Sequence, residues 1–112
     1  MVIRNYNDSA ASPAHAGTIR AHTVIPKGSV IEPPFDSAWG YLGGPGRLET
    51  HSHTAAEIYI IFKGSGRVHV DGEFAEVGCG DIVEIPSGAP HDIENLSDGE
   101  LLWLAFWWKE NL

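Results

Sequence analysis

The sequence is poor in cysteine, in basic residues and in long apolar runs. These shortages argue in turn against a disulfide, against anionic partners and against a membrane span. It has a single cysteine, Cys79, so no internal disulfide can form, which is typical of a reducing compartment. Seven basic residues stand against fifteen acidic ones, and the formal charge of -8 repels phosphate backbones and anionic membranes. The longest apolar run, residues 101–108, is far shorter than a membrane span, and the first residues lack the apolar core of a signal peptide. We therefore expect a cytoplasmic protein with neither nucleic-acid nor membrane partners.

Helical periodicity is also lacking. No stretch sustains apolar residues at helical spacing for three turns, and 13 Gly and 7 Pro interrupt the chain. Runs of strand length and composition lie at residues 18–25, 37–42, 48–53, 58–62, 67–70, 82–85, 91–95 and 101–108. Asp71-Gly72 follows RVHV and precedes EFAEV, a pattern that predicts a hairpin with a type I′ turn. The sequence thus predicts a single all-β domain, a sandwich or barrel over residues 18–112, preceded by an N-terminal arm at residues 1–17.

The stretch HSHTAAE places His51, His53 and Glu57 close together. In an unbulged strand, alternate residues share one face, and that row would contain Arg47, Glu49, His51, His53, Glu57 and Tyr59. If the row faces inward, a divalent cation is the simplest way to make converging imidazoles and a carboxylate tolerable inside a protein. If it faces outward, the histidines are merely solvated, and the spacing alone leaves both interpretations open.

A second stretch, GDIVEIPSGAPHDIEN at residues 80–95, supplies a further histidine, and the two segments together resemble the two motifs of the cupin superfamily. The first motif is matched by Gly46, His51, His53, Glu57 and Gly64. The second is matched by Gly80, Pro86, Gly88, His91 and Asn95. The sequence departs from the family at the start, because Gly46 is one residue closer to the histidines than usual. That departure leaves the direction of Arg47 and Glu49 open.

The resemblance to small, single-domain bacterial-type cupins implies a jelly-roll β-barrel, also called a double-stranded β-helix, with little helix. It implies metal ligands at His51, His53, Glu57 and His91. This mixed nitrogen and oxygen set suits one divalent transition metal per subunit, with Mn or Fe expected first and Ni, Zn, Co or Cu as alternatives. With four protein ligands, an octahedral ion keeps positions open for substrate.

Several residues near the motifs are candidates for catalytic or substrate-binding roles beside the metal. Glu57, Glu49 and Tyr59 are candidate catalytic residues, and Arg47 is a candidate clamp for a substrate carboxylate. The candidates for the wall of the cavity are Trp39, Tyr41, Trp103 and Phe106. The structural alternatives are a surface ion pair for Arg47 and Glu49, and core or interface packing for the aromatic rings.

The other polar residues receive structural interpretations. We expect His69 at the surface, His22 at the surface or as a satisfied core residue, no role for His15 in the arm, and a solvated side chain for Asp92 beside the expected ligand His91.

The function that fits best is a metal-dependent enzyme acting on a small oxygenated or carboxylate-bearing molecule, as a dioxygenase, decarboxylase, isomerase or lyase. One alternative is a non-catalytic small-molecule sensor. Another is a metal-free sugar epimerase or cyclase in which the histidines and Glu57 act as acid and base. Residues 101–108 are apolar on both faces, and Ile58, Ile60 and Phe62 form a second apolar row, so we also expect a homodimer.

Overall fold

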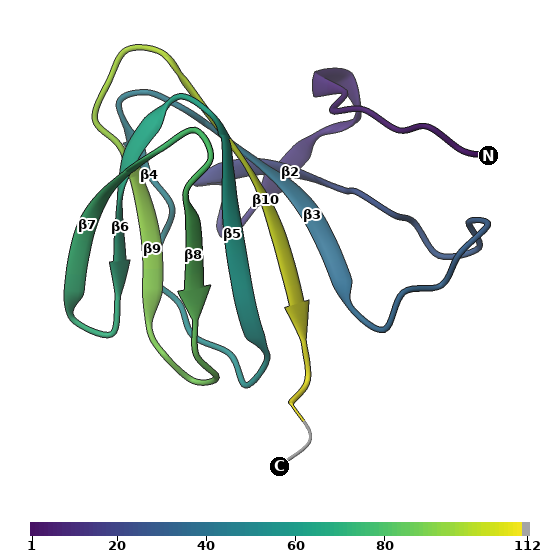
Figure 1. The fold of residues 1–112 in the computed structure, drawn as a ribbon. Helices are drawn as coiled ribbons and strands as arrows, with labels where there is room; N and C mark the ends of the chain where they lie inside the picture. Colours follow the sequence, from purple (N-terminus) through teal and green to yellow (C-terminus); the bar gives the residue numbers. More distant parts are fainter. Residues whose placement is uncertain (111–112) are drawn as a thin grey trace.

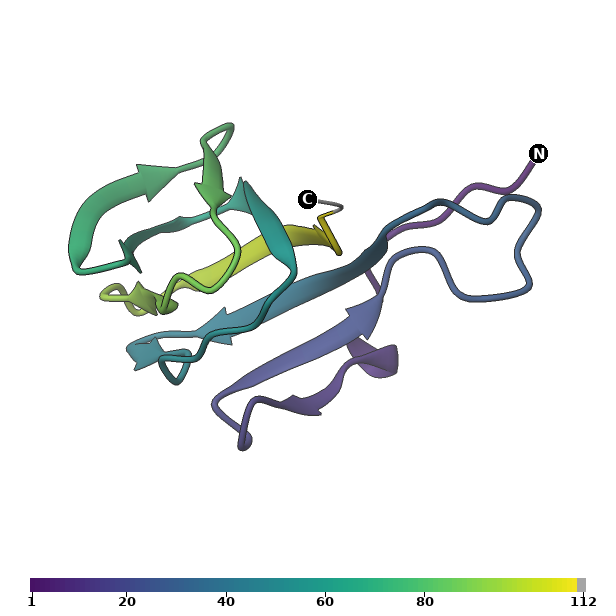
Figure 2. The same cartoon turned by 90° about the horizontal axis from the view of Figure 1, so that it is seen from below.

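The computed structural model describes residues 1–110, which fold into a six-stranded sheet and a four-stranded sheet, both antiparallel (Figure 1). The six-stranded sheet has the order β1-β2-β3-β10-β5-β8, and the four-stranded sheet the order β4-β9-β6-β7. The strands are β1 (Ser12–Ala14), β2 (Ile19–Thr23), β3 (Asp36–Gly43), β4 (Gly46–Arg47), β5 (Ala56–Lys63), β6 (Ser65–Val70), β7 (Glu73–Gly78), β8 (Ile82–Ile85), β9 (His91–Asn95) and β10 (Glu100–Trp108). Figure 2 shows the sheets from below, with the loop between β2 and β3 extending away from them.

The all-β prediction is confirmed, and within residues 1–110 the helical content is one 3-10 turn, η1 (Asp8–Ala10). No helix in this range is long and apolar enough to cross a membrane. The predicted hairpin is present too. Asp71 and Gly72 adopt φ angles of 51° and 84° and bring β6 beside β7, with Val70 opposite Glu73. Two positive φ angles in succession are what a type I′ turn requires.

The predicted strand at residues 48–53 is wrong. The chain leaves regular pairing after β4 and keeps only single contacts with β9. The amide of Leu48 donates to the carbonyl of Ile93 at 3.0 Å, and His51 forms an isolated bridge with His91. The reason is the short entry to the motif, because a two-residue β4 fixes too few pairs to hold the following residues in one register. The alternation assumed for Arg47, Glu49 and His51 therefore does not apply.

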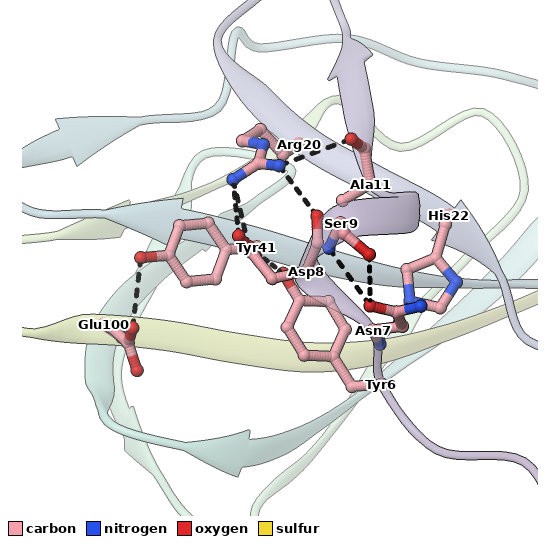
Figure 3. Close-up of polar contacts among 9 residues, drawn as sticks. All are labelled: Tyr6, Asn7, Asp8, Ser9, Ala11, Arg20, His22, Tyr41 and Glu100. Carbon is pink, nitrogen blue, oxygen red and sulfur yellow. Dashed lines mark hydrogen bonds and ion pairs between the residues drawn. The ribbon is translucent and has the colours of Figure 1, made fainter.

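The predicted arm contributes to the sheet. Residues 12–14 form the edge strand β1, which pairs with β2. Before it, the chain packs on the six-stranded sheet, where the ring of Tyr6 stacks on His22 at 5.2 Å between centroids. Arg20 of β2 forms an ion pair with Asp8 at 2.9 Å (Figure 3). An aromatic stack and an ion pair thus hold the N-terminal segment on the sheet.

Apolar side chains from both sheets fill the space between them. Ile61, Ile85, Ile93, Leu101 and Trp103 are all fully buried, as expected for alternate residues that point inward from opposite sheets. A glycine makes room for the largest of them. At Gly40, any Cβ would collide with the indole ring of Trp103.

Asn95, at the end of β9, joins three parts of the chain through a buried amide. Its Nδ2 donates to the carbonyl of Leu42 in β3 and to that of Gly99, both at 2.9 Å. Its Oδ1 accepts from the amide and the hydroxyl of Ser97 at 3.0 and 2.8 Å. The last residue of the second motif is therefore a structural clamp.

Replacing Asn95 by alanine should strongly destabilise the protein, because the substitution leaves buried partners without hydrogen bonds. We expect Asn95→Ala to lower the free energy of unfolding by about 2–4 kcal/mol, measured by urea denaturation. The neighbouring Leu96→Ala, at an exposed side chain, should change it by less than about 0.5 kcal/mol. Equal effects of the two substitutions would contradict the clamp.

Candidate metal centre

The structure brings together the four residues that the motifs nominate as ligands. His51 and His53 lie in the segment between β4 and β5, Glu57 is on β5, and His91 begins β9. One ligand atom from each lies within 4.8 Å of all the others. Oε1 of Glu57 is 3.1 Å from Nε2 of both His53 and His91. The four side chains form one group able to hold a metal ion.

All three imidazoles are oriented by the backbone. Each places Nδ1 against a carbonyl oxygen two residues away in sequence, at 2.9 Å for His51 and 2.8 Å for both His53 and His91. A carbonyl oxygen only accepts hydrogen bonds, so each Nδ1 carries the hydrogen. In the neutral ring the lone pair is then on Nε2, the atom directed toward Glu57 in His53 and His91. Such orientation by a second partner is typical of metal-bound histidine.

This arrangement fits a bound cation. Three Nε2 lone pairs and a carboxylate are all acceptors, and acceptors 3.1 Å apart repel one another unless a positive charge lies between them. A proton on His91 partly meets the need. Burial lowers the pKa of His91, but the hydrogen bond to Glu57 raises it, and the net shift is upward. The three nitrogens and one oxygen are the donor set preferred by divalent transition metals rather than by Ca²⁺.

The carboxylate of Asp92 is buried beside this centre, with 1% of the residue exposed. It accepts hydrogen bonds from Arg47 at 2.9 Å, Thr50 at 2.6 Å and His69 at 2.9 Å. Burial raises the pKa of Asp92, but these three donors outweigh it and hold the pKa below its usual value. The prediction that Asp92 is solvated is wrong, and His69 is not simply exposed.

Asp92 therefore fastens the ligand-bearing loop to the ligand-bearing strand. Thr50 directly precedes His51, and Asp92 directly follows His91. The hydrogen bond between Thr50 and Asp92 thus ties two ligands together from behind. Arg47 takes part in the same group, so its guanidinium is directed to Asp92 and does not line the cavity.

A cavity of about 390 Å³ opens beside His51, His53 and Glu57. Its apolar wall includes Leu48, Trp103 and Trp107. Small residues widen it where β2, β3 and β10 meet: Ala21, Ala38, Gly40 and Ala105. A volume of this size, lined by apolar groups with a few convergent polar ones, is typical of a small-molecule site.

The predicted site residues divide between the cavity and the rest of the molecule. Tyr59, Trp103 and Trp39 line the cavity, although the ring of Trp39 packs edge-on against Phe62, at 5.5 Å between centroids. The other four do not line it: Arg47, Glu49, Tyr41 and Phe106.

Contacts elsewhere account for most of these four residues. The hydroxyl of Tyr41 donates to Glu100 at 3.3 Å (Figure 3). The ring of Phe106 packs against Phe35 at 5.4 Å between centroids. Glu49 is exposed and uses its backbone carbonyl to orient His51.

Tyr59 is the buried hydroxyl of the cavity, with 2% of the residue exposed. Burial raises its pKa well above the usual value, and the negative charge of Glu57 adds to the effect. A phenol that its raised pKa keeps protonated therefore lines the cavity beside the candidate ligands.

Several lining residues were not predicted from the sequence, among them His15, Thr54 and Trp107. Trp107 carried a signal, because it lies four residues after Trp103 in a strand and so shares its face. Thr54 lies next to the motif histidines. No sequence signal pointed to His15, because it reaches the cavity from the turn between β1 and β2. Burial and the nearby His51 lower the pKa of His15.

Comparison with known proteins agrees with this geometry. A family model described as a cupin domain matches residues 39–107. A cupin 2 conserved barrel domain protein from Salinispora arenicola has a similar structure, with a TM-score of 0.86 and 26% identity, over 97% of this chain and 89% of that one.

Two curated relatives are enzymes by name. A dimethylsulfoniopropionate lyase from Ruegeria pomeroyi is 36% identical over 77 residues, which are 67% of this chain and 49% of the relative. An acireductone dioxygenase from Gluconacetobacter diazotrophicus is 40% identical over 48 residues, which are 39% of this chain and 27% of the relative. The chain thus spans less than half the length of either relative.

Proposed function

Because this chain belongs to the cupin family, we propose that it is an enzyme that holds one divalent transition metal, Mn or Fe first, through His51, His53, Glu57 and His91. Its substrate would be a small oxygenated or carboxylate-bearing molecule. The observation that carries the proposal is the group of backbone-oriented Nε2 atoms and one carboxylate beside a cavity of about 390 Å³. The bound metal would supply positive charge and open coordination positions.

The cavity supports a substrate with two unlike ends. Of its lining residues within 1–110, none is Lys or Arg, so the protein offers no side-chain cation for an acidic group there. The acidic or oxygenated end belongs with the metal ligands. Trp103 and Trp107 form an apolar wall suited to the other end. A substrate that is acidic at both ends would bury an unpaired charge against this wall.

Tyr59 is the residue we propose for proton donation. Its side chain is buried, and its hydroxyl stays protonated because its pKa is raised. Tyr59 lies two residues after Glu57 on β5, so both side chains are on the face of the strand that lines the cavity. A positioned proton donor fits chemistry in which negative charge develops on a substrate oxygen. The names of the two curated relatives, a lyase and a dioxygenase, support these two reaction types as candidates for the metal site. Arg47 and Glu49 receive no role in this proposal.

Metal binding is the first test. Protein purified without a His tag or chelators should contain close to one transition-metal ion per chain by elemental analysis. We expect His91→Ala to weaken metal affinity by about 100-fold or more, because loss of a ligand should exceed the effect of losing an outer partner. His22→Ala is the matched control, since His22 packs against Tyr6 away from the cavity. Metal-free wild-type protein, with no response to His91→Ala, would favour acid-base catalysis without metal.

Turnover is the second test. Metal-loaded protein should transform at least one member of a panel of small diketones, catechols, thiols and carboxylates. Oxygen consumption during turnover would identify an oxygenase, and its absence would identify a lyase, decarboxylase or isomerase. We expect Tyr59→Phe to lower kcat by about 100-fold or more without changing metal content. Tight binding of a panel member without turnover would support a sensor and contradict the enzyme proposal.

We also propose that a second copy of the chain covers the apolar face of β5 and β8. Phe62 is 54% exposed there, near Ile58, Ile60 and the exposed Ile82. Such a patch is unusual on a monomer. Light scattering should find a dimer for the wild type and a monomer for Phe62→Arg. Phe74→Arg, at a 65% exposed ring on β7 of the other sheet, should stay dimeric. A monomeric wild type at micromolar concentration would contradict the proposal.

A further inference from the structure

The turn between β1 and β2 carries an imidazole to the cavity. His15 lines the cavity, and the centroid of its ring lies 4.3 Å from that of the candidate ligand His51. The turn has an uncommon backbone. His15 and Ala16 have φ angles of 50° and 59°, and Gly17 follows at 78°. Residues with a Cβ rarely enter this left-handed region, and a tight hairpin turn is what holds two of them in it here.

Hydrogen bonds connect this turn to the metal centre. The hydroxyl of Thr18 donates to the carbonyl of His15 at 2.7 Å and accepts from the amide of Glu49 at 3.2 Å. The carbonyl of Glu49 in turn accepts from Nδ1 of His51 at 2.9 Å. One continuous chain of contacts therefore fixes the turn relative to a metal ligand, so the position of His15 does not depend on a free arm.

The imidazole of His15 differs from those of the ligands in its hydrogen bonding. Each ligand histidine has its Nδ1 engaged by a backbone carbonyl. Within residues 1–110, the ring nitrogens of His15 make no hydrogen bond to protein, and its ring is tilted by 35° against that of His51. His15 is exposed at the edge of the cavity on a turn whose backbone is fixed, so its ring nitrogens can meet a group that enters the cavity.

We propose that His15 is a substrate-binding residue that forms a hydrogen bond with a small molecule coordinated to the metal. Resting on the proposed function, the inference adds a contact from outside residues 39–107, the part matched by the family model. The group recognised would be an oxygen of the substrate, close to the metal-bound end. His15 thereby limits which chelating molecules fit between the hairpin turn and the metal ligands.

Acetohydroxamate, a small molecule that chelates metals through two oxygens, can serve as the probe. Calorimetric titrations would measure Mn²⁺ binding to the metal-free protein, then acetohydroxamate binding to the Mn²⁺-loaded protein. His15→Gly removes the ring and is comfortable at positive φ. We expect it to weaken acetohydroxamate binding roughly fivefold to tenfold, the effect of one hydrogen bond, and to leave Mn²⁺ affinity within about twofold. His15→Asn, which tolerates the same backbone and keeps polar atoms, should fall between wild type and His15→Gly.

Ala16→Gly is the matched control, because it loosens the same turn without removing the imidazole. It should bind acetohydroxamate like the wild type, and thermal melting should show all three variants folded. Unchanged probe affinity in His15→Gly, or an equal loss in Ala16→Gly, would overturn the inference while leaving the metal centre intact. A fall in Mn²⁺ affinity like that of His91→Ala would make His15 a ligand instead. Wild-type protein that binds no metal would overturn the proposed function, and this inference with it.

Discussion

Three hydrogen bonds from imidazole Nδ1 atoms to backbone carbonyls set the geometry of the candidate metal centre. They place the hydrogen on Nδ1, the nitrogen that faces the backbone, and direct Nε2 toward the candidate metal centre. The centre is therefore built from hydrogen-bond acceptors. Since the carbonyls belong to the same short segments as the histidines, the backbone path of residues 49–55 and 89–91 sets the geometry directly. Residues 49–55 lie outside the regular strands, so the carbonyls of Glu49 and Ala55 can accept hydrogen bonds from the imidazoles.

The rest of the barrel supports this irregular path from two sides. Behind the ligands, buried Asp92 holds Thr50 and Arg47 against β9. In front, the turn at residues 15–17 reaches the same loop through Thr18. A buried carboxylate is costly to place in an apolar environment, and here Arg47 neutralises its charge while Thr50 and His69 donate further hydrogen bonds to it. The contacts of Asp92 with Arg47 and Thr50 thus hold the segment between β4 and β5 in place. In the regular strands, ladders of backbone hydrogen bonds have this role.

The sequence predicted the parts of the molecule that depend on local patterns. Gly and Pro spacing indicated an all-β sandwich or barrel, Asp71-Gly72 identified a hairpin, and two motifs located four converging candidate ligands. It failed where side-chain direction depends on register. Arg47 and Glu49 were candidates for the cavity only if the strand ran unbroken, and the two-residue β4 does not continue into the residues that follow it. His15 lay beyond prediction, because only the pairing of β1 with β2 brings that part of the sequence to the metal centre.

The small residues on one side of the cavity set its volume without taking part in the candidate metal centre. Ala38 and Ala105 face each other across β3 and β10, and neither contributes to the ligand set or to the network around Asp92. The space above them is therefore set by side chains that the metal centre does not need. Larger or smaller side chains at these positions would change the volume and shape of the cavity while leaving all four candidate ligands in place.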